Sequence, residues 1–111
     1  MDNDDKQQTR KEFAKAVNMA PAEIDKWLGT AESKAVGWPK DRDGRESVGH
    51  HSGRRIIEIK HRSVEDLTES DYDHMRKVVG YVHRHLAQRP TGDITQTPWR
   101  YSLMNWGHDP K

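Results

Sequence analysis

The stretch from Leu67 to Pro90 (LTESDYDHMRKVVGYVHRHLAQRP) constrains the fold most strongly. Its apolar residues recur at intervals of three and four positions, which is the period of one face of an α-helix. Thr68 suits the N-cap position with Asp71 at N3, and a helix cannot continue past the proline at its end. The sequence therefore predicts a long amphipathic helix with a buried apolar stripe, formed by Tyr72, Met75, Val79, Val82 and Leu86.

Gly80 lies inside this predicted helix, where glycine costs roughly 1 kcal/mol relative to alanine. It shares a helix face with Asp73, Arg76 and Ala87. A glycine at such a position often permits a neighbouring chain to come near. We therefore expect another backbone to approach the helix closely at Gly80.

Residues 10–28 predict two short helices separated by a turn. Pro21 suits the first position of the second helix, and Asn18 lies in the turn, where asparagine tolerates a left-handed backbone better than most residues. The spacing resembles a helix-turn-helix. However, Glu23 and Asp25 occupy the second helix, where a helix that reads a DNA groove usually carries basic or amide side chains. A plain helical hairpin is the favoured interpretation, and a helix-turn-helix is the alternative.

Residues 37–53 contain four glycines and are typical of a long irregular loop. We expect Thr30 to cap a short turn before this loop and Ser52 to cap a helix after it, in SGRRIIEIKHR. A β-strand is the alternative for the three isoleucines of that segment. No second β-branched run is present to pair with such a strand, and a lone strand is not stable.

The C-terminal stretch TPWRYSLMNWGHDPK predicts a final helix, with Thr97 as its N-cap, Pro98 at N1 and Gly107 after its end. Its inward face, which we expect to cover the stripe of the long helix, consists of Trp99, Leu103 and Trp106. The predicted fold is all-α: a small single-domain bundle of four to five helices with a long, basic, glycine-rich loop. The polar residues 1–10 are expected to be frayed, so the helical domain spans 11–111.

The composition excludes several classes of protein. There is no cysteine, and no apolar run approaches the ~20 residues that span a bilayer. We therefore expect a soluble, cytoplasmic protein.

The net charge of +1 hides an uneven distribution of charged residues along the chain. Residues 1–33 carry five bases and seven acids, residues 34–62 carry eight bases and four acids, and residues 63–111 carry six bases and seven acids. The basic excess therefore belongs to the middle of the chain.

No residue pattern indicates a catalytic or metal centre. His83 and His85 are two positions apart and diverge on a helix, and the adjacent His50 and His51 diverge as well. The zinc spacings HExxH and Cys/His are absent from the sequence, and no serine lies in a nucleophile-elbow context. We predict a protein that is not an enzyme and that uses no cofactor or metal ion.

The stretch GRESVGHHSGRR has the features of a phosphate-binding loop that leads into a helix. Glycines allow backbone N–H groups to turn toward an anion, and a helix N-terminus presents further N–H groups. The phosphate-loop pattern of nucleotide hydrolases, Gly-Lys-Ser/Thr, is absent. The predicted ligand is therefore the phosphate backbone of DNA, contacted by Arg45, His50, His51, Ser52, Gly53, Arg54, Arg55, Lys60, Lys77 and Arg84.

Simpler roles remain open for the same residues. Arg54 and Arg55 can pair with Glu58 or with acids of the long helix and hold the loop in place. The polar stripe of the long helix can be an ordinary solvated face; it consists of His74, Lys77, Tyr81, Arg84 and Gln88. For the whole protein, the alternative to DNA binding is a protein–protein interaction or homo-oligomerisation module. Salt separates the two, because phosphate contacts weaken steeply with ionic strength.

Three blocks of the sequence resemble a known family of small proteins, catalogued as domain of unknown function 3140. They are ESVGHHSGRRIIEI, HMRKVVGYVHRHLAQRP and TPWRYSLMNWGHDP, and the resemblance runs from about Phe13 to Pro110. It implies one compact domain over nearly the whole chain. Members of the family are sometimes labelled DNA-binding, which implies the same activity here without assigning it to particular residues.

Overall fold

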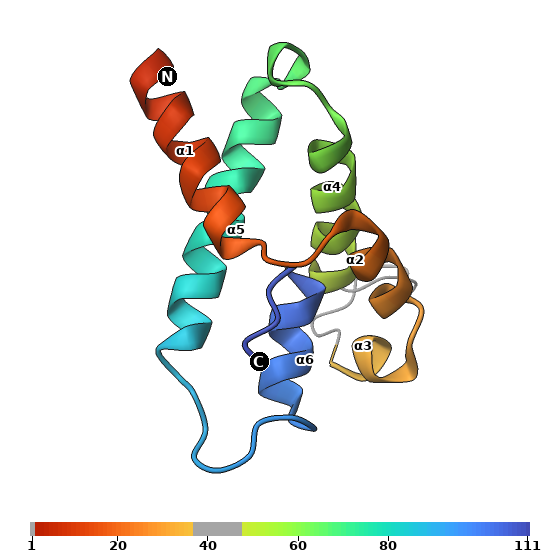
Figure 1. Ribbon diagram of the computed structural model, residues 1–111. Coiled ribbons are helices and arrows are strands. Elements are labelled where there is room, and N and C mark those ends of the chain that lie inside the picture. The colour runs from red at the N-terminus through yellow and green to blue at the C-terminus, as the bar shows by residue number, and fades with distance from the viewer. Residues whose placement is uncertain (1, 37–47) are drawn as a thin grey trace.

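The structure is a computed structural model that describes residues 2–36 and 48–111 (Figure 1). These residues form six α-helices and one 3-10 turn, and they contain no strand. In chain order the elements are α1 (Asn3–Ala16), α2 (Pro21–Leu28), α3 (Ala31–Ala35), α4 (Val48–His61), η1 (Val64–Asp66), α5 (Glu69–Leu86) and α6 (Pro98–Asn105). The all-α prediction is confirmed. The helix count exceeds four to five because the turn predicted after Thr30 is the short helix α3.

Three of the predicted helix starts have the expected side-chain caps. The Thr68 hydroxyl accepts from the Asp71 N–H, and the Asp71 carboxylate accepts from the Thr68 N–H, which completes a capping box. Thr30 and Thr97 cap α3 and α6 in the same way through their hydroxyl groups. At the end of α6, Gly107 has a φ of 80°, and the next N–H, that of His108, donates back to the Leu103 carbonyl. This is a Schellman motif, as the glycine predicts.

The helix α5 is the longest helix of the described chain and packs against α1, α4 and α6. It runs antiparallel to α4, to which it is joined through η1, and α1 packs along it (Figure 1). The helix α6 contacts α2, α3, α4 and α5 and so joins the two halves of the fold. The largest fully buried apolar side chains come from α2, α4, α5 and α6, and they are Ile24, Ile56, Val78, Val82 and Leu103.

The predicted stripe of α5 is confirmed except at its end. Tyr72, Met75, Val79 and Val82 are buried, whereas the Leu86 side chain is 36% exposed. Val78, which the stripe omits, is fully buried instead. The reason is that α5 is covered by α1 on one side and by α4 and α6 on another. Its buried face is therefore wider in the middle of the helix than one stripe.

The two N-terminal helices do not form a hairpin. α1 packs on α5 while α2 packs on α4, so the packed pair that a helical hairpin or a helix-turn-helix requires is not formed (Figure 1). Asn18, in the connection between them, does not adopt a left-handed backbone. The helix α1 begins at Asn3 with Asp2 as its cap. The expected fraying of residues 1–10 concerns their dynamics and stays a prediction.

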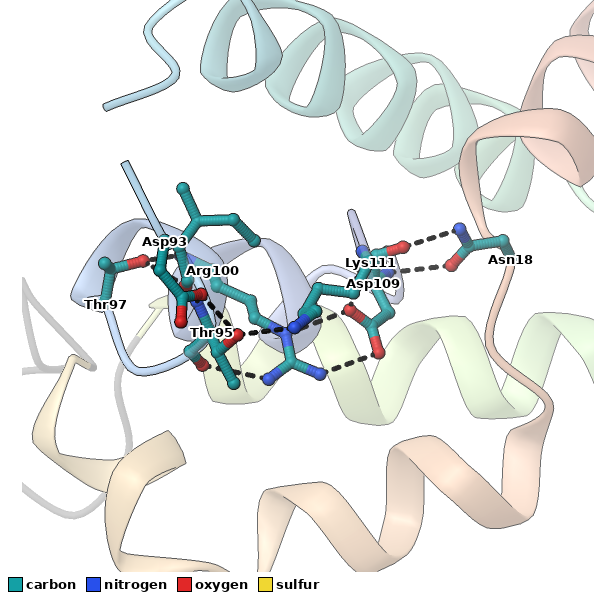
Figure 2. A network of polar contacts seen from close by, with 8 residues as sticks. Asn18, Asp93, Thr95, Thr97, Arg100, Asp109 and Lys111 are labelled. Carbon is teal, nitrogen blue, oxygen red and sulfur yellow. Dashed lines mark hydrogen bonds and ion pairs between the residues drawn. The ribbon is translucent and has the colours of Figure 1, made fainter. Parts of the chain in front are cut away.

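The C-terminal tail holds the connection between α1 and α2 in place (Figure 2). The Asn18 side chain donates to the Asp109 carbonyl at 2.9 Å and accepts from the Asp109 N–H at 2.7 Å. The Asp109 carboxylate accepts two hydrogen bonds from the Arg100 guanidinium, both at 3.0 Å, and Arg100 also donates to the Thr95 carbonyl. This pairing with Arg100 lowers the pKa of the Asp109 carboxyl, although burial acts in the opposite direction. The tail therefore fixes the path that the chain takes from α1 to α2.

The start of α4 differs from its prediction. The helix begins at Val48, so Ser52 is an interior residue and not the N-cap, and Gly49 and Gly53 are helical. A Cβ atom at position 53 would lie 2.8 Å from the Asn105 carbonyl oxygen and 2.9 Å from a Leu28 methyl carbon. These glycines allow α4 to approach α6 and α2 closely. Packing against other helices, which the local sequence does not reveal, explains why a glycine-rich segment is helical here.

Gly80 plays a different part from the one predicted. No other backbone lies within 4 Å of the position of a Cβ atom there, among the neighbours that the structure describes. The nearest atom is Nη1 of Arg84, at 3.1 Å. The glycine therefore makes room for the Arg84 guanidinium to lie against the helix.

Nowhere in residues 2–36 and 48–111 does a helix reach the length and apolarity needed to cross a membrane.

Candidate nucleic-acid interface

Of the ten residues predicted to contact phosphate, the structure describes nine, and it disperses them. His50, Ser52 and Gly53 are buried on the inner side of α4. His51 and Arg54 lie on its exposed side, and Lys77 and Arg84 are exposed on α5. Arg45 and the rest of the predicted loop from 37 to 47 lie outside the described residues. The anion-binding loop predicted around Ser52 is therefore not formed, because these residues belong to a packed helix.

His50 belongs to a buried polar network between α2, α3, α4 and α6. Its Nε2 atom lies 2.7 Å from the Ser33 hydroxyl oxygen, and that hydroxyl donates to the Asn105 side-chain carbonyl. Since the Ser33 proton is used in this way, Nε2 of His50 must carry the proton and donate. The Trp27 indole also donates to Asn105, at 2.8 Å. The network joins α3 to α6 and leaves His50 no surface for a phosphate contact.

Ser52 is engaged with α5. Its hydroxyl oxygen lies 3.0 Å from Nε2 of His74. Burial and the nearby charges of Arg55, Lys77 and His51 lower the pKa of His74 to about 4. The His74 side chain is therefore neutral at physiological pH and adds no positive charge to the surface.

Arg55 forms the ion pair that the simpler interpretation expects. Its Nη1 atom lies 2.6 Å from Oδ1 of Asp71, and Arg62 lies 2.6 Å from the other oxygen of the same carboxylate. The Asp71 side chain is fully buried, at 0% exposure. Burial raises the pKa of this carboxyl, but the Thr68 N–H and the two guanidinium groups outweigh it and lower the pKa to about 2. Two bases of the 34–62 segment are thus held by one buried carboxylate, although the Arg62 side chain is itself 38% exposed.

Lys60 is half-buried as well. Its Nζ atom lies 5.8 Å from the centre of the Phe13 ring, and burial lowers the pKa of its ammonium group. This arrangement joins α4 to α1 by a cation–π contact. Lys60 therefore serves the packing of two helices rather than an open cationic surface.

Lys77 and Arg84 remain as cations of α5 that have no ion pair with any described residue. They are seven positions apart, so they lie on one helix face, with Tyr81 between them. Together these three residues form one side of a pocket of about 250 Å³. The other described residues that line it are Val36, Val48, Gly49, Ser102, Asn105 and Trp106. Among these described lining residues the charged side chains are the two cations, so this side of the pocket favours an anion.

Four aromatic rings form a column beside this pocket. The Trp106 ring lies between His74 and Tyr81, with its centre 6.3 Å from that of His74 and 4.2 Å from that of Tyr81. His85 covers the other face of Tyr81 at 4.7 Å. All three pairs are nearly parallel stacks. Because these ring faces are covered, Trp106 and Tyr81 offer their polar edges rather than their faces to a ligand.

The Tyr81 hydroxyl is part of the polar lining. Burial raises the pKa of this hydroxyl, while a hydrogen bond with Ser102 and the charge of Arg84 act in the opposite direction. Tyr81 therefore stays protonated at physiological pH and can donate a hydrogen bond. The polar stripe of α5 was predicted to face away from the core, but Tyr81 and His74 are half-buried.

The pocket was not predicted as a site, although Lys77 and Arg84 were predicted to contact phosphate. The spacing of Lys77, Tyr81 and Arg84 indicates a common helix face, but nothing in the sequence places Ser102 and Trp106 beside it.

Within the described ranges, no group of three or more His, Asp or Glu side chains is arranged to hold a metal ion. The Ser33–His50 pair has the atoms of a catalytic dyad, but Ser33 is completely buried.

Comparison with known proteins identifies the family. No curated protein and no solved structure matches the chain. The family model described as "Protein of unknown function (DUF3140)" matches residues 12–104, which is most of the chain and covers all of α2 to α5. The protein therefore belongs to the DUF3140 family.

Proposed function

We propose that the protein binds nucleic acid through phosphate contacts made by Lys77 and Arg84 of α5. The observation that carries the proposal is the charge of this face: the two cations have no acidic partner among the described residues, and none of the described residues that line the pocket between them is a carboxylate. His51, exposed at the start of α4, lies near enough to His74 to affect its pKa, as Lys77 does. The exposed side of α4 therefore lies next to this face of α5.

The expected ligand-binding mode is electrostatic and independent of base sequence. Arginine and lysine contacts to phosphates release counterions, so the affinity falls steeply as salt is added. Arg55 and Arg62 take no part, because Asp71 holds both. Buried His50, Ser52 and Gly53 are likewise excluded from this surface.

A protein–protein interaction module has weaker support. The exposed large hydrophobic residues of the described chain are Val48, Val64 and Leu86, which lie on three different elements. An apolar docking surface requires a contiguous patch, which single exposed residues do not make. This function therefore remains the competing outcome of the experiment and is not proposed.

The test measures the binding of duplex and single-stranded DNA by fluorescence anisotropy at two salt concentrations. Lys77→Ala combined with Arg84→Ala should weaken binding and reduce the slope of log K against log salt on duplex DNA. The reduction should be about two units, because two phosphates are no longer neutralised. The matched control is Lys11→Ala with Lys15→Ala, which removes two exposed charges from α1 and does not touch the pocket.

The control double variant should keep the wild-type salt slope. Equal reductions in the two double variants would show that only net charge matters, and the assignment to Lys77 and Arg84 would be wrong. Absence of binding by the wild-type protein at about 50 mM salt, where phosphate contacts are strong, would exclude the nucleic-acid function.

A further inference from the structure

We propose that the pocket between α4, α5 and α6 binds a phosphomonoester, such as the 5′-phosphate at the end of a nucleic-acid strand. The proposal rests on the proposed function in part, since Lys77 and Arg84 serve both. It goes further because it assigns a concave site with its own donors to one terminal group. A phosphate on the convex backbone of a duplex can meet the two cations at the rim, whereas only a terminal or free phosphate can enter the pocket.

The strongest observation concerns the Trp106 indole. The protein's other described tryptophans use their N–H groups: Trp27 donates to Asn105, and Trp99 donates to the His85 carbonyl at 2.6 Å. Nε1 of Trp106 makes no hydrogen bond to a described residue, although the side chain is only 4% exposed. The nitrogen itself is not enclosed by protein, because the one buried side-chain atom without a hydrogen-bond partner among the described residues is Oδ1 of Asp71. The indole N–H is therefore a donor that a ligand or water can reach. Trp106 lines the pocket, so this open donor is available to a ligand there.

Gly49 keeps this donor accessible. A Cβ atom at position 49 would lie 3.5 Å from Nε1 of Trp106 and 3.3 Å from the Asn105 side chain. The glycine thus forms the pocket wall directly beside the indole N–H. Gly49 is also in the first turn of the 14-residue helix α4, whose N-terminal end carries a partial positive charge. This charge adds to the attraction for an anion at the same wall.

The remaining donors complete a phosphate site. The hydroxyl groups of Ser102 and Tyr81 line the pocket, and Lys77 and Arg84 supply two positive charges. Gly80 lets the Arg84 guanidinium lie close to the helix axis, beside the pocket. A phosphomonoester carries close to two negative charges at neutral pH and three acceptor oxygens, which matches this set better than a carboxylate does. The volume of about 250 Å³ is below that of pockets for drug-sized ligands, so the site suits a small group.

The first experiment compares two single-stranded oligonucleotides of the same sequence, one with a 5′-phosphate and one with a 5′-hydroxyl, at one salt concentration. We expect the phosphorylated strand to bind at least about tenfold more tightly, since several charge-assisted hydrogen bonds are added. Inorganic phosphate should compete with it, and acetate at equal ionic strength should not. Equal affinities for the two strands, without competition by phosphate, would overturn the proposal.

The second experiment uses variants that alter the indole donor. Trp106→Phe keeps an aromatic ring and removes the N–H, so the preference for the 5′-phosphate should fall severalfold. The smaller ring also leaves a cavity between His74 and Tyr81 and lowers the unfolding midpoint, so binding is compared at a temperature at which every variant is folded. The matched control is Trp99→Phe, which removes an N–H that already has its partner in the protein. It should lower the unfolding midpoint and keep the preference. Ser102→Ala gives a second removal of a donor and should also reduce the preference.

The two proposals fail in different ways. If both Trp106→Phe and Ser102→Ala retain the full preference for a 5′-phosphate, the pocket is not its binding site. If neither oligonucleotide binds the wild-type protein, the nucleic-acid function is wrong. In that case titration with inorganic phosphate tests whether the pocket binds phosphate. Shifts of the Trp106 indole N–H resonance in NMR spectra would support phosphate binding in the pocket, and their absence would exclude it.

Discussion

The carboxylate of Asp71 on α5 lies 2.6 Å from the guanidinium of Arg55 on α4, and the Asp71 side chain is completely buried. The same residue also completes the capping box at the start of α5. One side chain therefore caps the helix and binds it to its neighbour. A buried ion pair of this kind is costly to break, because the partner that remains is left uncompensated.

Asp71 should make stability depend on acid pH. The pKa of its carboxyl is about 2 in the folded protein and about 3.9 when the chain is unfolded. A lowered pKa stabilises the fold above pH 4, and this contribution of about 2 kcal/mol is lost as the pH falls from 4 to 2. Urea unfolding of the wild type and of Asp71→Asn measures it: the difference between them should shrink over this interval. A difference that stays constant would contradict the ion-pair account.

His74 should produce a second pH dependence at higher pH. Its pKa is lowered to about 4 in the folded protein, against about 6.5 in the unfolded chain. Since protonation favours the unfolded state, stability should be complete above pH 6.5 and fall by up to about 3 kcal/mol toward pH 4. His74→Gln cannot titrate and should flatten this part of the profile. His83→Gln, an exposed change on the same helix, should leave the wild-type slope.

Replacing two helix glycines, Gly80 and Gly53, by alanine should change the free energy of unfolding in opposite directions. Alanine has the higher helix propensity at both positions, by about 1 kcal/mol. Gly80→Ala meets only the flexible end of Arg84 and should raise the free energy of unfolding. Gly53→Ala places a methyl group 2.8 Å from the Asn105 carbonyl oxygen and should lower it by about 1–3 kcal/mol. Chemical denaturation of both variants tests this, and equal effects would show that α4 does not pack closely on α6.

The exposed end of α5 offers a test of its buried face. Val82 is almost completely buried, so Val82→Ala should cost about 1–3 kcal/mol through the removal of buried methyl groups and the cavity left behind. Leu86→Ala removes more carbon atoms from a side chain that is partly in water, and it should cost less. The comparison uses denaturation midpoints at one pH. A larger destabilisation by Leu86→Ala would show that Leu86 belongs to the buried face of α5, as the sequence alone predicts.

The sequence by itself determined the features that depend on neighbours along the chain. The Thr68–Asp71 box, the Thr97 cap and the left-handed Gly107 are each formed within a few residues, so the local sequence contains the donor, the acceptor and the backbone preference. The period of the α5 stripe is local too, and it located most of the buried face. The all-α class followed from these signals.

Only the tertiary structure decided the start of α4 and the composition of the pocket. Gly53 is helical because Asn105 and Leu28 pack against it, and the Ser33–Asn105 hydrogen bond joins positions 72 residues apart. Helical periodicity shows that Lys77, Tyr81 and Arg84 share a face, but it does not show that Ser102 and Trp106 lie opposite. The reason is physical: the glycine and serine preferences that favour a loop are small, and close packing between distant segments outweighs them.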